Sequence, residues 1–274
     1  MTRPDLSDYL RGRLWVPKAY VAAHLVGHRD LRRLVVVTEG RAGSEALVTR
    51  LDSHPDILCD SEILATRRMR PEDVVEGRAR LARVRGRRAY GFKVLTRHIL
   101  SVQDVPEATD YLRRLEGAGW LVIHLRRRNR LQQAISALRA QRTQYHFEVG
   151  HLPPFEPMRV EPAELLAVLE LYTAAEGEAT RLLGGMHPLK LVYEDDLASS
   201  DAQERTVARI VEALGLQAAP TSTRQARVSP RSVRDMVTNY EELVELLAHT
   251  PFACHLDLPV GPTEPDVPAN PRAG

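Results

Sequence analysis

Short apolar runs alternate along the chain with longer segments in which apolar residues recur every three or four positions. The short runs predict core strands, at 34–38, 57–60, 89–95, 121–127 and 189–194. The longer segments predict helices, at 44–53, 104–120, 129–143, 163–183 and 201–216. Because strands that alternate with helices form a parallel sheet covered on both faces, the pattern predicts an α/β fold of three layers, a central parallel sheet flanked by helices.

The segments outside this alternation divide the chain. Residues 1–33 are predicted as an N-terminal extension, 34–256 as one domain, and the proline-rich 257–274 as a disordered tail. Residues 143–162 carry aromatic residues and prolines without a period, which indicates a loop or lid. The segment 64–89 holds nine arginines and is interpreted as an exposed helical face. No nucleic-acid partner is expected, because no aromatic residues interleave with these arginines.

Composition narrows the class of protein. A chain of 274 residues that is 43% hydrophobic can bury a full core, and its net charge of +2 indicates no bias towards polyanions. Cys59 and Cys254 match no metal or disulfide spacing, and no run reaches the roughly 20 apolar residues of a membrane span, so we expect a cytoplasmic protein. The bias to arginine and alanine is typical of a GC-rich bacterial genome. Against it the three lysines stand out: Lys18, Lys93 and Lys190.

The stretch LVVVTEGRAGSEALVTRL, residues 34–51, combines a strand, a turn bracketed by glycines and a helix. Gly40 and Gly43 flank Arg41, and Ser44 begins the helical spacing. Glycine lets backbone N–H groups close around an anion at a helix N-terminus, so this loop is predicted to hold a phosphate-like group. It lacks the Gly-Lys-Ser/Thr ending of nucleotide triphosphatases.

Three motifs, in the right order, resemble those of sulfotransferases that use 3′-phosphoadenosine 5′-phosphosulfate (PAPS). The first is RAGSEALVTRLDSHPDILCDSE, which resembles the phosphosulfate loop and following segment of tyrosylprotein sulfotransferases. Its matching positions are Arg41, Gly43, Ser44, His54, Pro55, Asp56, Cys59 and Glu62. The second pairs Arg128 with Ser136, as in the family's 3′-phosphate motif. The third, 229–256, resembles the C-terminal segment of small bacterial sulfotransferases.

The resemblance implies a P-loop-like fold, PAPS as co-substrate, no metal, and transfer of a sulfuryl group to an acceptor. It favours Glu62 as the general base, with Arg41 on the group transferred. Lys93, in a lysine-poor chain, is a further catalytic candidate as a positive charge near the bridging oxygen. Donor binding is assigned to a wider set: Arg41, Ala42, Gly43, Ser44, Glu45, Arg128, Ser136 and Arg224. Arg224 is included because it lies with Arg227 and Arg231 in a loop-like stretch that can close over the nucleotide.

Each assignment has a plainer alternative. Arg41 can be a surface arginine in a glycine turn, and Ser44 a helix N-cap. Glu62 can be a glutamate that caps a helix start, and Lys93 a lysine that extends from a strand end to solvent.

Several neighbours are weighed separately. Glu45 follows Ser44 where the family has Thr or Trp, so either its carboxylate turns away from the donor or donor affinity suffers. Asp60 is the second candidate for the base. His98 resembles the catalytic histidine of cytosolic sulfotransferases but stands at a different offset. Solvated charge around a strand end is the preferred interpretation of three arginines: Arg126, Arg127 and Arg130.

The acceptor side is the least defined by the sequence. Four side chains near the lid either line an acceptor pocket or pack in the core: Tyr145, His146, Phe147 and Phe155. We expect transfer to a hydroxyl, with an amine as the lesser alternative, of a small-molecule, carbohydrate or natural-product acceptor. A homodimer is possible. Two competing interpretations are a P-loop kinase or nucleotide triphosphatase, and a nucleotide-binding module that has lost turnover because of Glu45.

Overall fold

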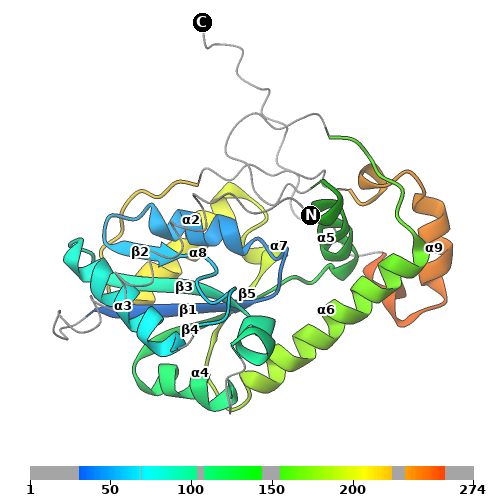
Figure 1. Cartoon of the computed structure of the whole chain (residues 1–274). Coiled ribbons are helices and arrows are strands. Elements are labelled where there is room, and N and C mark those ends of the chain that lie inside the picture. Colours follow the sequence, from blue (N-terminus) through cyan, green and yellow to red (C-terminus); the bar gives the residue numbers. More distant parts are fainter. Residues whose placement is uncertain (1–30, 69, 104–107, 144–154, 224–231, 257–274) are drawn as a thin grey trace, which may run out of the picture.

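The computed structural model describes residues 31–68, 70–103, 108–143, 155–223 and 232–256. Its centre is a five-stranded parallel sheet with the strand order β2-β3-β1-β4-β5 (Figure 1). The strands are β1 (Arg32–Thr38), β2 (Ile57–Asp60), β3 (Ala89–Leu95), β4 (Trp120–Arg126) and β5 (Leu189–Val192).

Helices join these strands and extend beyond them. They are α2 (Ser44–Asp52), α3 (Pro71–Val84), α4 (Ala108–Gly117), α5 (Arg130–Thr143), α6 (Pro162–Leu182), α7 (Tyr193–Asp196), α8 (Ser200–Ala213) and α9 (Tyr240–Ala248). Three short turns complete the described elements: the π-helix η1 (His98–Val102) and the 3₁₀ turns η2 (Arg234–Met236) and η3 (Pro251–His255). No helix in the described ranges is long and apolar enough to cross a bilayer.

The apolar residues of the sheet point alternately into two cores. In β1, Val35 and Val37 pack with residues of α3, α4 and the end of α6. Leu34 and Val36 pack on the other face with α2 and α8. Figure 1 shows α2 and α8 on one side of the sheet and α4 on the other. The predicted α/β fold, a central parallel sheet between two layers of helices, is confirmed.

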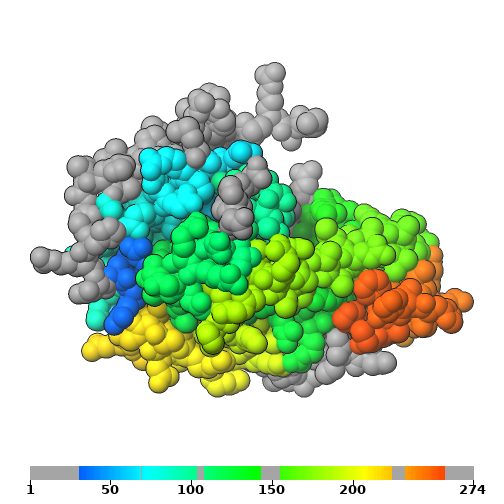
Figure 2. Space-filling view, turned by 90° about the horizontal axis from the view of Figure 1, so that it is seen from below, coloured from blue at the N-terminus to red at the C-terminus, as the bar shows by residue number. Residues whose placement is uncertain are grey.

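A third core lies beside the sheet. Ile135 of α5, Leu169 of α6 and Leu247 of α9 are fully buried together there. Figure 2 shows the C-terminal segment, orange to red, at the end of the molecule next to α6. The long helix α6 therefore reaches from the sheet to this C-terminal core.

The sheet register fixes where the loops meet. Thr38, the last residue of β1, pairs with Leu95 of β3 and Leu125 of β4. Parallel strands place all their carboxyl ends at one edge, which is where ligands bind in open α/β sheets. The loop after β1 therefore lies between the segments that follow β3 and β4.

A few boundaries differ from those predicted. β1 begins at Arg32, and the strand expected at 189–194 ends at Val192, where the chain turns into α7. The π-helix after β3 was not predicted. The predicted tail, most of the N-terminal extension and most of the lid lie outside the described residues.

Candidate active site

Two residues of the loop between β1 and α2 have left-handed backbone conformations, Arg41 and Gly43. Gly43 has φ 77°, and a Cβ added there would lie 2.6 Å from Cδ2 of Tyr193, so this position requires glycine. Arg41 has φ 64° and is the one non-glycine residue of the described ranges with a positive φ. That conformation costs about 1–2 kcal/mol for a residue with a side chain. Residues held in costly conformations cluster at functional sites, so Arg41 is a candidate on backbone grounds alone.

These conformations aim the N-terminus of α2 at the carboxyl edge of the sheet. Gly43 is the N-cap, and no described side chain caps it. Ser44, weighed above as an N-cap, is the first helical residue and is buried. The first N–H groups of a helix have no acceptor within the helix, and the helix dipole favours negative charge beside them. Ala42 is fully buried and offers only its backbone. These features are typical of a loop that binds an anion.

The two predicted phosphate motifs touch each other. Nε of Arg41 donates to Oγ of Ser136, which lies on α5 and 95 residues further along the chain, at 3.1 Å. Burial lowers the pKa of Arg41 from its ordinary value, but a guanidinium stays charged at neutral pH. The contact therefore places a lasting positive charge between the loop and α5.

Lys93 is the centre of an ionic cluster on the same edge. Its side chain is 2% exposed, so it does not extend to solvent. Nζ lies 2.8 Å from Oε2 of Glu45 and 3.1 Å from Oε1 of Glu62. The same Oε2 of Glu45 accepts a hydrogen bond from Ser61 at 2.8 Å. Glu45, which stands where the enzymes that the sequence resembles have Thr or Trp, is therefore held by Lys93 and Ser61.

Glu62 joins this cluster to a buried histidine. Its side chain is 31% exposed, which leaves it reachable by a second substrate. Oε2 of Glu62 lies 3.6 Å from Nε2 of His98, whose side chain is fully buried. The π-helix turns the chain back directly after β3 and brings His98 over the strand end. His98 was discounted because its offset differs from that of the catalytic histidine of cytosolic sulfotransferases, and the unpredicted π-helix is what places it beside Glu62.

Asp60 is engaged elsewhere. Nε of Arg78 donates to Asp60 at 2.7 Å, and Nη2 of Arg78 also contacts this carboxylate. Arg78 is 7% exposed. This corrects the interpretation of 64–89 as an exposed face: Arg78 turns inwards because Asp60, at the end of β2, offers it a bidentate partner.

The segment after β4 is clamped by Glu194. Its carboxylate accepts the backbone N–H groups of Arg128 and Asn129, each at 2.9 Å. The Arg128 side chain is 46% exposed and pairs with Asp195. It remains open to solvent, where an incoming phosphate can compete for it.

The arginine before it behaves differently. Arg127 is 8% exposed, donates to the carbonyl of Arg41 at 2.9 Å and lies 4.4 Å from the ring centroid of Tyr193. Its predicted role as solvated charge is wrong, because the loop carbonyl and the aromatic ring give it buried partners. Arg126 is exposed as expected, and the half-buried Arg130 donates to the carbonyl of Tyr172.

Glu39 was not singled out from the sequence, although it directly follows the apolar run of β1. It is 9% exposed and accepts a hydrogen bond from the hydroxyl of Thr96. Burial raises its pKa from 4.5 to about 7, and the nearby carboxylate of Glu176 adds to the rise. Glu39, Thr96 and Glu176 therefore form a second polar group near the end of β1.

Other predicted residues are distant from this cluster or outside the described ranges. Phe155 packs against the third core, with the guanidinium of Arg139 at 3.8 Å from its ring centroid. Six predicted residues lie outside the described ranges: Tyr145, His146, Phe147, Arg224, Arg227 and Arg231. In the part of the chain that the structure describes, no group of three or more His, Cys, Asp or Glu residues could hold a metal ion.

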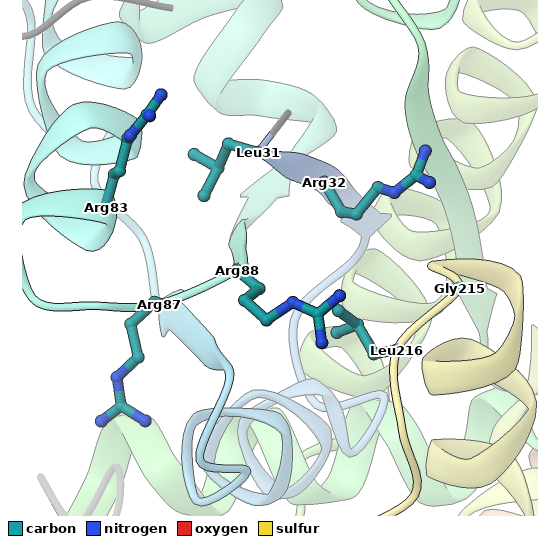
Figure 3. Close-up of a pocket in the computed structure, with 7 residues that line it drawn as sticks. All are labelled: Leu31, Arg32, Arg83, Arg87, Arg88, Gly215 and Leu216. Atoms are coloured by element: carbon teal, nitrogen blue, oxygen red, sulfur yellow. The ribbon is translucent and has the colours of Figure 1, made fainter. Parts of the chain in front are cut away.

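A hollow lies at the opposite edge of the sheet, beside the amino ends of β1 and β3. It has a volume of about 530 Å³ and is lined by four arginines, with Leu31, Gly215 and Leu216. Figure 3 shows the guanidinium groups of Arg32, Arg83, Arg87 and Arg88 pointing in different directions. Arg87 is also bound to the carbonyl of His54 at 3.1 Å. These arginines do not converge on one point, unlike the groups at the carboxyl edge.

Crystal structures that are similar to the chain include two sulfotransferases. A sulfotransferase from Alicyclobacillus acidocaldarius matches at 16% identity and a TM-score of 0.47, over 84% of this chain and 95% of its own. The mouse sulfotransferase SULT7A1, complexed with PAP, matches at 16% identity and a TM-score of 0.41, over 74% of this chain and 65% of its own. No protein-family model matches the sequence, and no curated protein does. The roles of the site residues are therefore judged from their own contacts.

Proposed function

We propose that this protein is a sulfotransferase that moves the sulfuryl group of PAPS to a hydroxyl, or less favourably an amine, of a small acceptor. The observation that carries the proposal is the 3.1 Å contact between Arg41 and Ser136. These residues belong to two stretches that resemble the phosphate motifs of such enzymes. The sheet brings the two stretches together, because β1 and β4 are neighbours, and the side-chain hydrogen bond places their polar groups at one point.

The donor is assigned to the loop and α5. Arg41 and the first N–H groups of α2 take the 5′-phosphosulfate, because both supply donors and positive charge. Ser136 and the exposed Arg128 take the 3′-phosphate. Lys93 lies between Glu45 and Glu62 and offsets part of their negative charge, which favours an anion site beside them.

Glu62 is assigned the role of general base. As the acceptor oxygen bonds to sulfur, its proton passes to Glu62. The bond between sulfur and the bridging oxygen breaks, and its electron pair stays on the 5′-phosphate. Arg41 and Lys93 stabilise the charge that develops there, the electrostatic contribution on which group transfer of this kind depends.

The test is transfer of labelled sulfate from PAPS to a panel of alcohols, phenols, sugars and amines, with EDTA present. We expect release of 3′-phosphoadenosine 5′-phosphate that depends on an acceptor and is abolished in Arg41→Ala. Arg205→Ala, which removes an exposed arginine of α8, is the matched control and should retain activity. Transfer of phosphate from Mg-ATP, with none of sulfate, would instead indicate a kinase.

A further inference from the structure

The hydrogen bonding of His98 fixes which of its nitrogens carries the proton. The ring stands at the start of the π-helix, fully buried, and its Nδ1 accepts the backbone N–H of Leu95 at 3.3 Å. A ring nitrogen that accepts a hydrogen bond bears no hydrogen. The neutral ring must therefore carry its proton on Nε2.

That Nε2–H faces Glu62. It lies 3.6 Å from Oε2 of Glu62, too far for a formed hydrogen bond, and no described atom bonds to it. A buried N–H without a partner is costly, so a small shift that closes this gap is favourable. Hydrogen bonds of a catalytic site are often long before the substrates bind and shorten in the loaded complex.

The ring stays neutral at physiological pH. Burial lowers the pKa of His98 from 6.5 to about 4, with Arg97 and Lys93 acting in the same direction and Glu62 against them. The charged groups that act on the ring are Lys93 of β3, Arg97 in the turn after β3 and Glu62 in the segment after β2. A neutral ring with its hydrogen on Nε2 is a donor on the side that faces Glu62.

We propose that His98 is a positioning residue, which donates Nε2–H to Glu62 and holds the carboxylate for proton transfer, rather than the base itself. The proposal rests on the function proposed above, because it assigns Glu62 the base's role. Lys93 contacts Oε1 and His98 faces Oε2, so the carboxylate is oriented from two sides. Each oxygen keeps a further lone pair for the acceptor. For His98 to act as the base, its proton would have to sit on Nδ1, directly against the N–H of Leu95.

Nitrogen-15 NMR of the labelled full-length protein tests this geometry without turnover. The chain has ten histidines, so the His98 signals are assigned by their loss in His98→Gln. We expect a neutral ring with its proton on Nε2, no titration between about pH 6 and 8, and a shift of the Nε2–H resonance in Glu62→Gln. A proton on Nδ1, or titration in this range, would overturn the proposal.

Kinetics separate positioning from base catalysis. In His98→Gln the side-chain amide can still donate to Glu62, so kcat should remain within about tenfold of the wild type. In His98→Leu it should fall by about 10- to 100-fold, by analogy with the loss of residues that orient metal ligands, with the KM for PAPS unchanged. Equal losses of about 10² to 10⁴ in both variants would identify His98 as the base.

Two controls keep the outcomes distinct. Thermal melting of both variants detects a loss of folding, and the NMR result on the wild type stands whatever these variants do. If the wild type transfers no sulfate to any acceptor, the proposed function fails, whereas the NMR measurement still decides the state of His98.

Discussion

Glu62 and Asp60 stand two residues apart at the end of β2, yet their surroundings assign them different tasks. Asp60 is held by the buried Arg78, whereas Glu62 is 31% exposed and faces Lys93 and His98. We predict that Glu62→Gln lowers kcat by about 10² to 10⁴ with donor affinity nearly unchanged. Steady-state kinetics with calorimetry of donor binding would check this. Glu212→Gln, on the exposed face of α8, is the control.

Asp60→Ala should produce the opposite pattern. Removing one partner of a buried ion pair leaves the other charge unpaired, so the free energy of unfolding should fall by about 3 kcal/mol. The folded fraction should keep its activity. Full stability together with lost turnover would show that Asp60 takes part in the chemistry.

Arg41 combines a functional side chain with a costly backbone. Both Arg41→Ala and Arg41→Gly should lose donor binding and turnover, because each removes the guanidinium. Only glycine adopts φ 64° without penalty, so the Gly variant should be more stable than the Ala variant by about 1 kcal/mol. Urea unfolding of the pair isolates the backbone cost. Equal stabilities would mean that the loop is not strained at this residue.

The contact partners of individual buried arginines could not be predicted from the sequence. The nine arginines in 64–89 predict solvated charge, because runs of like charges usually lie in solvent. Arg78 is nevertheless buried against Asp60. Arg127 is buried in the same way against Tyr193 and the carbonyl of Arg41. These partners lie far away in the sequence, so no local pattern predicts the contacts.

At the scale of elements, the loop from Glu39 to Gly43 depends on the shape of its glycine. Gly43→Ala should weaken donor binding and lower the free energy of unfolding by about 2–3 kcal/mol. Two effects add: the new Cβ would lie 2.6 Å from the ring of Tyr193, and alanine is strained at φ 77°. Gly86 has φ 74° with nothing within 4 Å of an added Cβ. Gly86→Ala should therefore cost only about 1 kcal/mol and leave donor binding intact. Equal effects of the two variants would contradict this account of the loop.

Elements were predictable where apolar spacing alone decides them. The strands at 57–60 and 89–95 match their predicted bounds, because most of their residues are apolar and the sheet is covered on both faces. The fifth strand ends earlier than predicted, at Val192. The carboxylate of Glu194 instead accepts the N–H groups after β4, and a helical turn places it there. The π-helix that positions His98 is likewise set by packing rather than by a periodic pattern.

At the scale of the whole molecule, the buried Glu39 predicts how stability depends on pH. Its pKa is about 7 in the folded protein against 4.5 in the unfolded chain, so the folded state holds a proton that the unfolded state releases. The stabilisation that comes from this bound proton is fully present below pH 4.5 and is lost as the pH rises through about 7. Relative to Glu39→Gln, the wild type should lose up to about 3 kcal/mol of stability over this range. Urea unfolding at pH 5 and pH 8 measures it, and a difference that is constant with pH would refute it.

We propose that the loop after β1 and the helix α5 together bind the two phosphates of an adenosine donor. Titration calorimetry of adenosine 3′,5′-bisphosphate, with EDTA present, measures this binding without an acceptor. We expect saturable binding of one nucleotide per chain, strongly weakened in Arg41→Ala and in Arg128→Ala but not in Arg205→Ala. Absence of binding at millimolar nucleotide, or binding that requires magnesium and prefers ATP, would contradict it.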